Sequence, residues 1–157
     1  MDSKSLLDRI AFFSRFSEVE KHQILCAQHH FVKFSAGEYL VRENDNDDTL
    51  YIILKGTAHV VKSSKPNHVL AKLTPGMIIG EVSFLTRRNR ITSVIADDEM
   101  ICFTINGSTM EELSVYSQNK IKDQLIEILV QRLDQTNQTL LDTITAVEGM
   151  VYTVVRK

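Results

Sequence analysis

The sequence has little of three things that would point to a partner or a compartment: cysteine, net charge and long apolar runs. It contains two cysteines, Cys26 and Cys102, and its net charge is only −2. Two cysteines cannot form a zinc site, and we expect both to be buried free thiols in a reducing compartment. The low charge excludes a bulk attraction to nucleic acid or acidic membranes, so an anion site would have to be local. No apolar run reaches the ~18 residues of a membrane span and the N-terminus lacks the segments of a signal peptide, which favours a cytoplasmic protein.

The histidines do not form a recognisable catalytic metal site. A jelly-roll enzyme of the cupin type needs a His-x-His pair together with a carboxylate and a further histidine. The five histidines never form that pair, and no nucleophile triad can be recognised in the sequence. We therefore expect a binding protein and not an enzyme.

The spacing of the apolar residues divides the chain into three zones. Residues 3–30 are typical of short helices, and Ser17 followed by Glu20 predicts a capping box that opens the second of them. From about residue 30 to residue 105, short runs of strand character alternate with turn residues, and eight such strands predict a β-sandwich or a jelly-roll barrel. The strands are expected in FVKF, EYLVRE, TLYIILK, TAHVVK, HVLAKL, MIIG, RITSVIA and MICFTI, and one or two helical turns are expected in EVSFLTRRN.

A helical period returns after residue 106 and continues almost to the end of the chain. Ser108 is a plausible cap for the segment TMEELSVYS, and a longer helix is expected to begin near Asn119. The apolar residues of that helix alternate steps of three and four, with Asn137 in the single polar gap. Such a seam packs either on its own barrel or on the same helix of a second subunit, and its length favours a homodimer. We expect one domain, with the barrel and its short helices in residues 1–117 and a long dimerisation helix in residues 118–157. The seam includes Ile126, Val130, Leu133, Leu140 and Ile144.

The stretch GEVSFLTRRNRITSVIA, residues 80–96, sets a carboxylate and a guanidinium among apolar residues. Gly80 allows a sharp turn and the close approach of a ligand. The amides of Glu81, Val82 and Ser83 would then be unpaired donors at the start of a short helix, and Arg90 can offer two parallel donors to a phosphate. Glu81 is a poor phosphate ligand but a good acceptor for a sugar hydroxyl. These residues fit a nucleotide monophosphate, and they fit equally a buried Glu–Arg ion pair that closes one end of a barrel.

The same stretch resembles the phosphate-binding cassette of the cyclic-nucleotide-binding domain family. The segments FSAGEYLVREND, DTLYIILKGTAHV and LTPGMIIGE resemble further motifs of that family in the same order, so that the resemblance covers roughly residues 10–140. It implies a mostly β fold: an eight-stranded jelly-roll β-barrel with N-terminal helices, a short phosphate-binding helix and a long C-terminal helix. The cassette positions that match are Gly80, Glu81, Arg90, Ser93, Val94 and Ala96.

The resemblance implies a role for each cassette residue. Arg90 would pair with the cyclic phosphate, and Glu81 would accept a hydrogen bond from the ribose 2′-hydroxyl. The backbone of Val82 and Ser83, with the Ser83 hydroxyl, would complete the phosphate cradle. The candidate ligand-binding residues are thus Gly80, Glu81, Val82, Ser83, Arg90, Ile91 and Thr92.

Three further positions bear on the choice of ligand. In activator-type members of the family, two polar residues of the long helix reach the adenine, one of them across the dimer, and the match places Thr136 and Asn137 there. A lone polar residue in a heptad also serves simply to fix register, and both readings stay open. Ile91 stands where cGMP-preferring members have threonine. It has no hydroxyl for a guanine, which argues against cGMP. It is also larger than the alanine or serine that cAMP binders usually have there, and its bulk beside the phosphate would narrow the pocket, which favours a member of the fold that binds no nucleotide.

The effectors that this family usually carries are not visible in the sequence. The heptad runs to the end of the chain without a helix-turn-helix, and the segment MDSKSLLDRI does not resemble a basic pseudosubstrate. We therefore expect a cAMP sensor without a DNA-binding domain, whose partners are the nucleotide, a second copy and an unknown effector protein, with no nucleic acid and no membrane. The alternative is a member of the fold that binds no nucleotide and acts as a dimerisation or protein-docking module.

Overall fold

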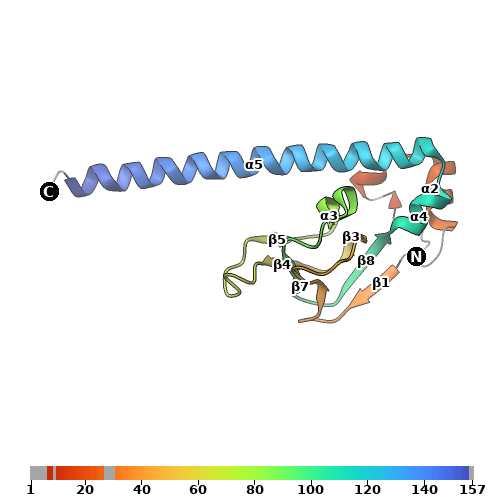
Figure 1. The fold of residues 1–157 in the computed structure, drawn as a ribbon, viewed down its shortest axis with the longest axis horizontal. Helices are drawn as coiled ribbons and strands as arrows, with labels where there is room; N and C mark the ends of the chain where they lie inside the picture. The colour runs from red at the N-terminus through yellow and green to blue at the C-terminus, as the bar shows by residue number, and fades with distance from the viewer. Residues whose placement is uncertain (1–6, 9, 27–30, 156–157) are drawn as a thin grey trace. The chain divides into compact units, whose positions relative to one another are not determined.

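The computed structural model describes residues 7–8, 10–26 and 31–155 of the chain. The chain forms two compact units, Met1–Asn119 and Lys120–Lys157. The first unit holds the 3-10 helix η1 (Ala11–Phe13), the helix α2 (Glu18–Cys26), the β-strands, and the short helices α3 (Glu81–Thr86) and α4 (Gly107–Glu112), as Figure 1 shows. The second unit is a single stretch of the long helix α5 (Val115–Val155).

The strands form two four-stranded antiparallel sheets, and the fold is the jelly roll that was predicted. The strand order is β1-β8-β3-β6 in one sheet and β2-β7-β4-β5 in the other. Strands that follow one another in the chain mostly lie in different sheets, so most ladders join segments that are far apart in sequence, and of the described strands only β4 and β5 are consecutive strands that pair. Phe103 of β8, for example, pairs with Phe31 on one side and with Ile52 on the other. The strands are β1 (Phe31–Phe34), β2 (Tyr39–Val41), β3 (Leu50–Lys55), β4 (Ala58–Val61), β5 (Ala71–Leu73), β6 (Ile78–Ile79), β7 (Ser93–Ala96) and β8 (Met100–Ile105).

Apolar side chains from both sheets form a buried core cluster. It includes Ile53 of β3, Val94 of β7 and Met100 of β8, and none of the three is more than slightly exposed. Burial of one such side chain contributes about 1.5–3 kcal/mol to folding, counted against a fully extended chain. This cluster holds the sheets together and so fixes the loops at their ends.

The two cysteines are both free, but only one of them is buried. Cys102 of β8 belongs to the core cluster, as predicted. The prediction was wrong for Cys26, which is exposed, with its Sγ atom 3.4 Å from Nε2 of His22. The buried face of α2 passes through Ile24, and two residues further on the helix has turned by about 200°, which places Cys26 on the outer face.

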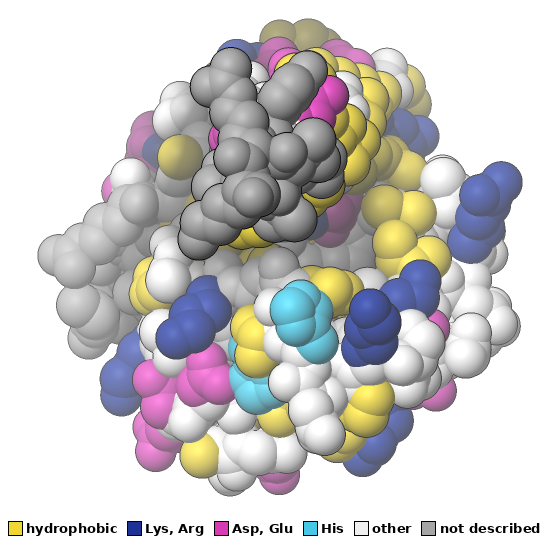
Figure 2. Space-filling model, turned by 90° about the vertical axis from the view of Figure 1, so that its left-hand side faces the viewer, with side chains coloured by type: hydrophobic (Ala, Val, Ile, Leu, Met, Phe, Trp, Pro, Cys, Tyr) yellow, Lys and Arg dark blue, Asp and Glu magenta, His cyan; other side chains and the backbone are white. Residues whose placement is uncertain are grey.

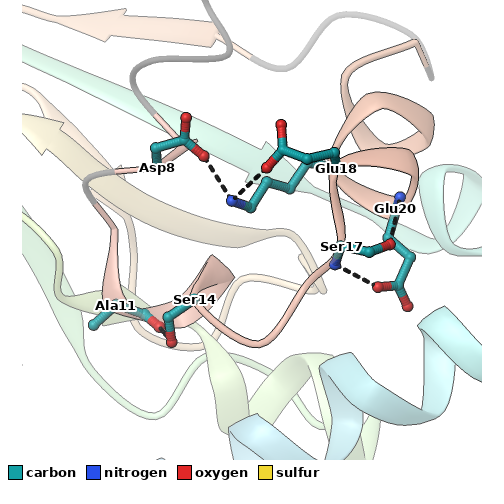
Figure 3. A network of polar contacts seen from close by, with 7 residues as sticks. Asp8, Ala11, Ser14, Ser17, Glu18 and Glu20 are labelled. Carbon is teal, nitrogen blue, oxygen red and sulfur yellow. Dashed lines mark hydrogen bonds and ion pairs between the residues drawn. The ribbon is translucent and has the colours of Figure 1, made fainter.

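Ser17 and Glu20 form the predicted capping box at the start of α2 (Figure 3). The backbone N–H of Glu20 donates to the Ser17 hydroxyl at 3.3 Å, and the backbone N–H of Ser17 donates to the Glu20 carboxylate at 2.7 Å. In the same turn, Nζ of Lys21 donates to Asp8 at 2.6 Å and to Glu18 at 3.3 Å. These contacts fix the first turn of α2 and connect it to residue 8.

The helices after β8 begin at other residues than the sequence indicated. Asn106, not Ser108, caps α4: its side chain accepts a hydrogen bond from the Thr109 backbone N–H at 3.0 Å, while the Ser108 hydroxyl donates to Asn106. Leu113 then takes an extended conformation, which ends α4, so that α5 begins at Val115 and not near residue 119. Among the described residues, no helix has the length and apolar character needed to cross a membrane.

Candidate ligand-binding site

Gly80 forms the junction between β6 and α3. Its backbone is left-handed, with φ at 92°, and it caps the N-terminus of α3 without any side chain. A Cβ atom at this position would overlap Nη1 of Arg90 and would lie 2.7 Å from the backbone oxygen of Thr49. Only glycine therefore fits, because both the conformation and the close approach of Arg90 exclude a side chain.

The helix α3 carries three of the expected site residues in its first turn. The side chains of Glu81 and Ser83 are buried, and that of Val82 is half-buried. The helix ends at Arg87, which is left-handed with φ at 58° and whose N–H donates to the Ser83 backbone oxygen. A six-residue helix bounded by two left-handed residues holds these side chains in one place against the barrel.

Arg90 is the most unusual side chain of the barrel, because it is a cation with only 3% of its surface exposed. Its Nη2 atom donates to the Asp47 carboxylate at 2.5 Å and also to the backbone oxygen of Thr49. Its Nε and Nη1 atoms are buried and find no acceptor in the part of the chain that the structure describes. Buried donors without partners cost about 1–3 kcal/mol each, and more when the group is charged. The site therefore presents two donors of a buried guanidinium, which an anion would satisfy.

The backbone of Arg90 is bound to the turn between β2 and β3. Its N–H donates to the Asp45 carbonyl at 2.9 Å, and its carbonyl accepts from the N–H of Asn44 at 2.8 Å. Asn44 takes a left-handed conformation, φ 72°, which asparagine tolerates better than most other residues. These bonds place the 44–49 segment directly beside the cassette.

Asp47 is the carboxylate that pairs with Arg90. Burial raises the pKa of Asp47, but hydrogen bonds from Arg90 and Thr49 outweigh that effect, so the pKa of this carboxyl lies below its usual value of 3.8. The Thr49 N–H donates to the other Asp47 oxygen at 2.9 Å. Tyr51 completes the surroundings, with its ring centre 5.8 Å from the guanidinium carbon of Arg90. Burial raises the pKa of the Tyr51 hydroxyl, with the Asp47 charge as a second cause.

Sequence reasoning missed Asp47, Thr49 and Tyr51. The run NDNDD, residues 44–48, has the composition of a turn and predicts nothing further, and a contact between residues 47 and 90 leaves no periodic signal. The one available signal was a carboxylate-rich turn directly before a buried strand in a protein that carries a buried arginine. Among the described residues, no three His, Cys, Asp or Glu side chains come together as metal ligands.

Ile91 and Thr92 lie beside Arg90 in sequence but differ from it in burial. Ile91 is 53% exposed, so its side chain does not plug the interior of the barrel. Thr92 is half-buried. Thr136 and Asn137 lie in the second unit, where both are exposed and the Thr136 hydroxyl donates to the Arg132 carbonyl at 2.8 Å.

The apolar seam of α5 is exposed along the helix. Figure 2, which looks from the C-terminal end of α5, shows hydrophobic side chains in yellow gathered along one side of it. The exposed fractions of the five predicted seam residues range from 46% to 60%. These residues are Ile126, Val130, Leu133, Leu140 and Ile144.

The fold and the site together define a class of protein: a jelly-roll domain in which a short helix lies beside a buried arginine that has two donors without an acceptor among the described residues. The model of the family described as "Cyclic nucleotide-binding domain" matches residues 31–116, which is more than half of the chain. The chain belongs to this family. The matched range contains the whole cassette and the turn that carries Asp47.

Known relatives with similar sequences include regulatory proteins and channels. The chain is 26% identical over 115 residues to the cAMP-dependent protein kinase regulatory subunit of Dictyostelium discoideum, which covers 70% of this chain and 35% of that protein. It is 34% identical over 84 residues to the potassium/sodium hyperpolarization-activated cyclic nucleotide-gated channel 1 of Homo sapiens, covering 53% of this chain and 9% of the channel. The chain thus spans about a third or less of these relatives, and the match is to their binding domain.

Solved structures show the same fold. A cyclic nucleotide-binding domain from Methylobacillus flagellatus superposes with a TM-score of 0.74 at 24% identity, covering 88% of this chain and 80% of that one. The catabolite activator protein of Thermus thermophilus gives a TM-score of 0.70 at 20% identity, covering 82% of this chain and 61% of that one. At these identities the similarity establishes the fold alone.

Proposed function

We propose that this domain is a sensor that binds cAMP in preference to cGMP and passes its occupancy on through its C-terminal helices. The observation that carries the proposal is Arg90, a buried cation with two donors that lack acceptors. An exocyclic phosphate offers two oxygens to such a pair, and charge-assisted hydrogen bonds of this kind are about twice as strong as neutral ones. A guanidinium keeps its charge at any physiological pH, so the site stays ready for an anion.

The other cassette residues take the roles that the family gives them. Glu81 accepts from the ribose 2′-hydroxyl, and Val82 and Ser83 complete the phosphate cradle. The absence of a side chain at Gly80 keeps the space that Arg90 occupies. Glu81 and Ser83 are both buried in the first turn of α3, directly after Gly80, whose missing side chain leaves room for Arg90.

The preference for cAMP rests on Ile91. Relatives of the chain bear the names of both cAMP-dependent and cGMP-dependent protein kinases, so relationship alone does not select a nucleotide. Isoleucine has no hydroxyl that could form a hydrogen bond with a guanine, whereas an adenine does not need a hydroxyl at this position. The exposure of Ile91 supports an open pocket, since its bulk lies at the surface.

A change in the populations of two arrangements would transmit the signal. Phosphate draws Arg90 and α3 together, and this displaces α4 and the start of α5. A ligand can shift such an equilibrium only by binding one arrangement more tightly than the other. The effector that reads the change is a further protein in the cytoplasm.

The helix α5 provides a surface for a second copy of the chain. With Val130 at heptad position a, the a positions hold β-branched residues and one asparagine, while two of the d positions hold leucine. This composition favours two parallel strands, and a single buried asparagine at an a position fixes their register. The a positions are Val130, Asn137 and Ile144, and the d positions are Ile126, Leu133 and Leu140.

Charges beside the seam favour the same orientation. Of the four e positions from residue 127 to residue 148, three carry carboxylates, Glu127, Asp134 and Glu148, and the fourth is Leu141. In an antiparallel pair these carboxylates would face one another, whereas a parallel pair separates them. Leu133→Asp should therefore give a monomer in analytical ultracentrifugation, while Gln131→Asp, on the outer face, should remain a dimer. A monomeric wild-type chain at micromolar concentration would contradict the dimer.

Isothermal titration calorimetry with cAMP and cGMP tests the sensor. We expect Arg90→Ala to lose about 2–3 kcal/mol of binding free energy, which is a loss of roughly 30- to 150-fold in affinity. Arg90→Lys keeps the charge and tests the bidentate geometry, and Arg88→Ala is the matched control, because Arg88 is exposed in the same loop. If neither nucleotide gives heat or raises the melting temperature at millimolar concentration, and none copurifies by mass spectrometry, the sensor is refuted and the docking module remains.

A further inference from the structure

Arg90 already has an anionic partner within the protein. Oδ2 of Asp47 lies 2.5 Å from Nη2 of Arg90, and the arginine side chain is almost entirely buried while Asp47 is about one-third exposed. The guanidinium is therefore paired with a charge before any ligand arrives. What the site offers a phosphate is two free donors on a cation whose charge is largely balanced.

The ion pair between Asp47 and Arg90 involves only their side chains. Two backbone hydrogen bonds, from the Arg90 N–H to the Asp45 carbonyl and from the Asn44 N–H to the Arg90 carbonyl, hold the two segments together without any contribution from the Asp47 carboxylate. Thr49 fixes the other oxygen of Asp47 at 2.9 Å, which aims the carboxylate at the arginine. The turn therefore keeps its backbone contacts with Arg90 whether or not the Asp47 carboxylate carries a charge.

The neighbouring carboxylate shows that this pairing is selective. Asp48 contacts the guanidinium of Arg87, which is 70% exposed, at the end of α3. An exposed ion pair contributes little and is weakened by salt, whereas a buried cation depends strongly on its counter-charge. Only Asp47, of these two adjacent residues, acts on the buried arginine.

We propose that Asp47 is a resident counter-anion of Arg90: it stabilises the empty domain and competes with the ligand phosphate for the guanidinium, so that it lowers the affinity of the site. The inference rests on the proposed function, since the competitor is the phosphate of a cyclic nucleotide. Two anions that share one buried cation repel each other, and at a separation of about 5 Å with an effective dielectric constant near 20 this repulsion is large. Even after screening at the partly exposed Asp47, we expect at least a tenfold effect on affinity.

The variant Asp47→Asn tests this, with Asp48→Asn as the matched control. Asparagine keeps the size of the side chain and an oxygen that accepts from Arg90 and Thr49, and removes only the charge. In calorimetry with cAMP, Asp47→Asn should bind at least ten times more tightly than wild type, and Asp48→Asn should stay within about twofold. Without ligand, Asp47→Asn should melt several degrees lower than wild type, because Arg90 then lacks its counter-charge, and Asp48→Asn should melt as wild type does.

The outcomes separate the inference from the proposed function. If wild type binds cAMP and Asp47→Asn binds equally or more weakly, Asp47 only positions Arg90, and the competition is refuted while the sensor stands. If the ligand-free melting temperature of Asp47→Asn is unchanged, the counter-anion role is refuted whatever the ligand does. If neither protein binds a cyclic nucleotide, the proposed function fails and the competition fails with it. If Asp47→Asn alone binds, both proposals are supported and Asp47 masks the site in wild type.

Discussion

Replacing Gly80 with alanine should damage the site far more than the same change at Gly76. Both glycines are left-handed, with φ at 92° and 90°, so alanine meets the same conformational penalty in each. They differ in their surroundings. A Cβ atom at Gly80 would overlap Arg90 and approach the Thr49 carbonyl, whereas a Cβ atom at Gly76 has no neighbour within 4 Å.

The expected loss of unfolding free energy follows from the hydrogen bonds that Arg90 loses. A left-handed alanine costs about 1–2 kcal/mol in either variant. At Gly80 the guanidinium must also move, which breaks its hydrogen bonds to Asp47 and to Thr49, and bonds of a charged group contribute about 1.5–3 kcal/mol. Two such bonds make the excess of Gly80→Ala over Gly76→Ala about 3–6 kcal/mol. For a chain of this length that corresponds to roughly 6–24 °C in melting temperature.

Urea unfolding of the two variants measures this excess, and cAMP titration measures its consequence for the site. Gly76→Ala should bind as wild type does, because the change lies outside the pocket, and Gly80→Ala should lose most of its affinity. Equal unfolding free energies for the two variants would refute the reasoning, since they would show that Arg90 does not need the space at Gly80.

Three other predictions concern the cap of α2, the two cysteines and the Asp47 carboxylate. Ser17→Ala removes the cap of α2 and should lower the free energy of unfolding by about 1 kcal/mol in urea titrations, with Ser14→Ala as a milder control. Ellman's reagent should label Cys26 in the native protein and Cys102 only after unfolding. Cys102 is buried, and burial raises the pKa of its thiol to about 12. Rapid labelling of both cysteines in the native protein would contradict the buried position of Cys102. Because the pKa of Asp47 is lowered by folding, its contribution to stability is present above about pH 4 and is lost as the pH falls through its folded pKa. The difference in unfolding free energy between wild type and Asp47→Asn should therefore shrink below pH 4, and a difference that persists to pH 2 would show that it has another origin.

Local patterns predicted most of the fold. The strand-like runs MICFTI and FVKF were enough to define β8 and β1 at their full length, and the Ser17–Glu20 spacing predicted a capping box that the structure contains. In these cases the signal lies within one turn or one strand, where side chain and backbone interact directly. The segment HVLAKL was less well predicted, because only its last three residues pair with β4 and its first three belong to the preceding loop.

The site could be predicted only in part, for a physical reason. The cassette is continuous in sequence, so Gly80, Glu81 and Arg90 were identifiable together. The partner of Arg90 lies 43 residues away, and nothing in the run NDNDD distinguishes the carboxylate that turns inward from its neighbours. The sequence also could not show which of two nearby polar residues caps α4. Asn106 and Ser108 are both good N-cap residues, and the three-dimensional path of the chain decides between them.

Asn44 and Asp45 bind the backbone of Arg90, whereas Asp47 and Thr49, further along the same turn, bind its side chain. Main-chain amides and carbonyls are the same for every amino acid except proline, so the backbone attachment is indifferent to which residue occupies position 90. Arg90 can therefore be replaced by another residue during evolution while the loop keeps its conformation. The fold of this region and its ability to bind an anion can therefore change independently in evolution. A relative that binds no ligand would have nearly the same backbone structure as one that does.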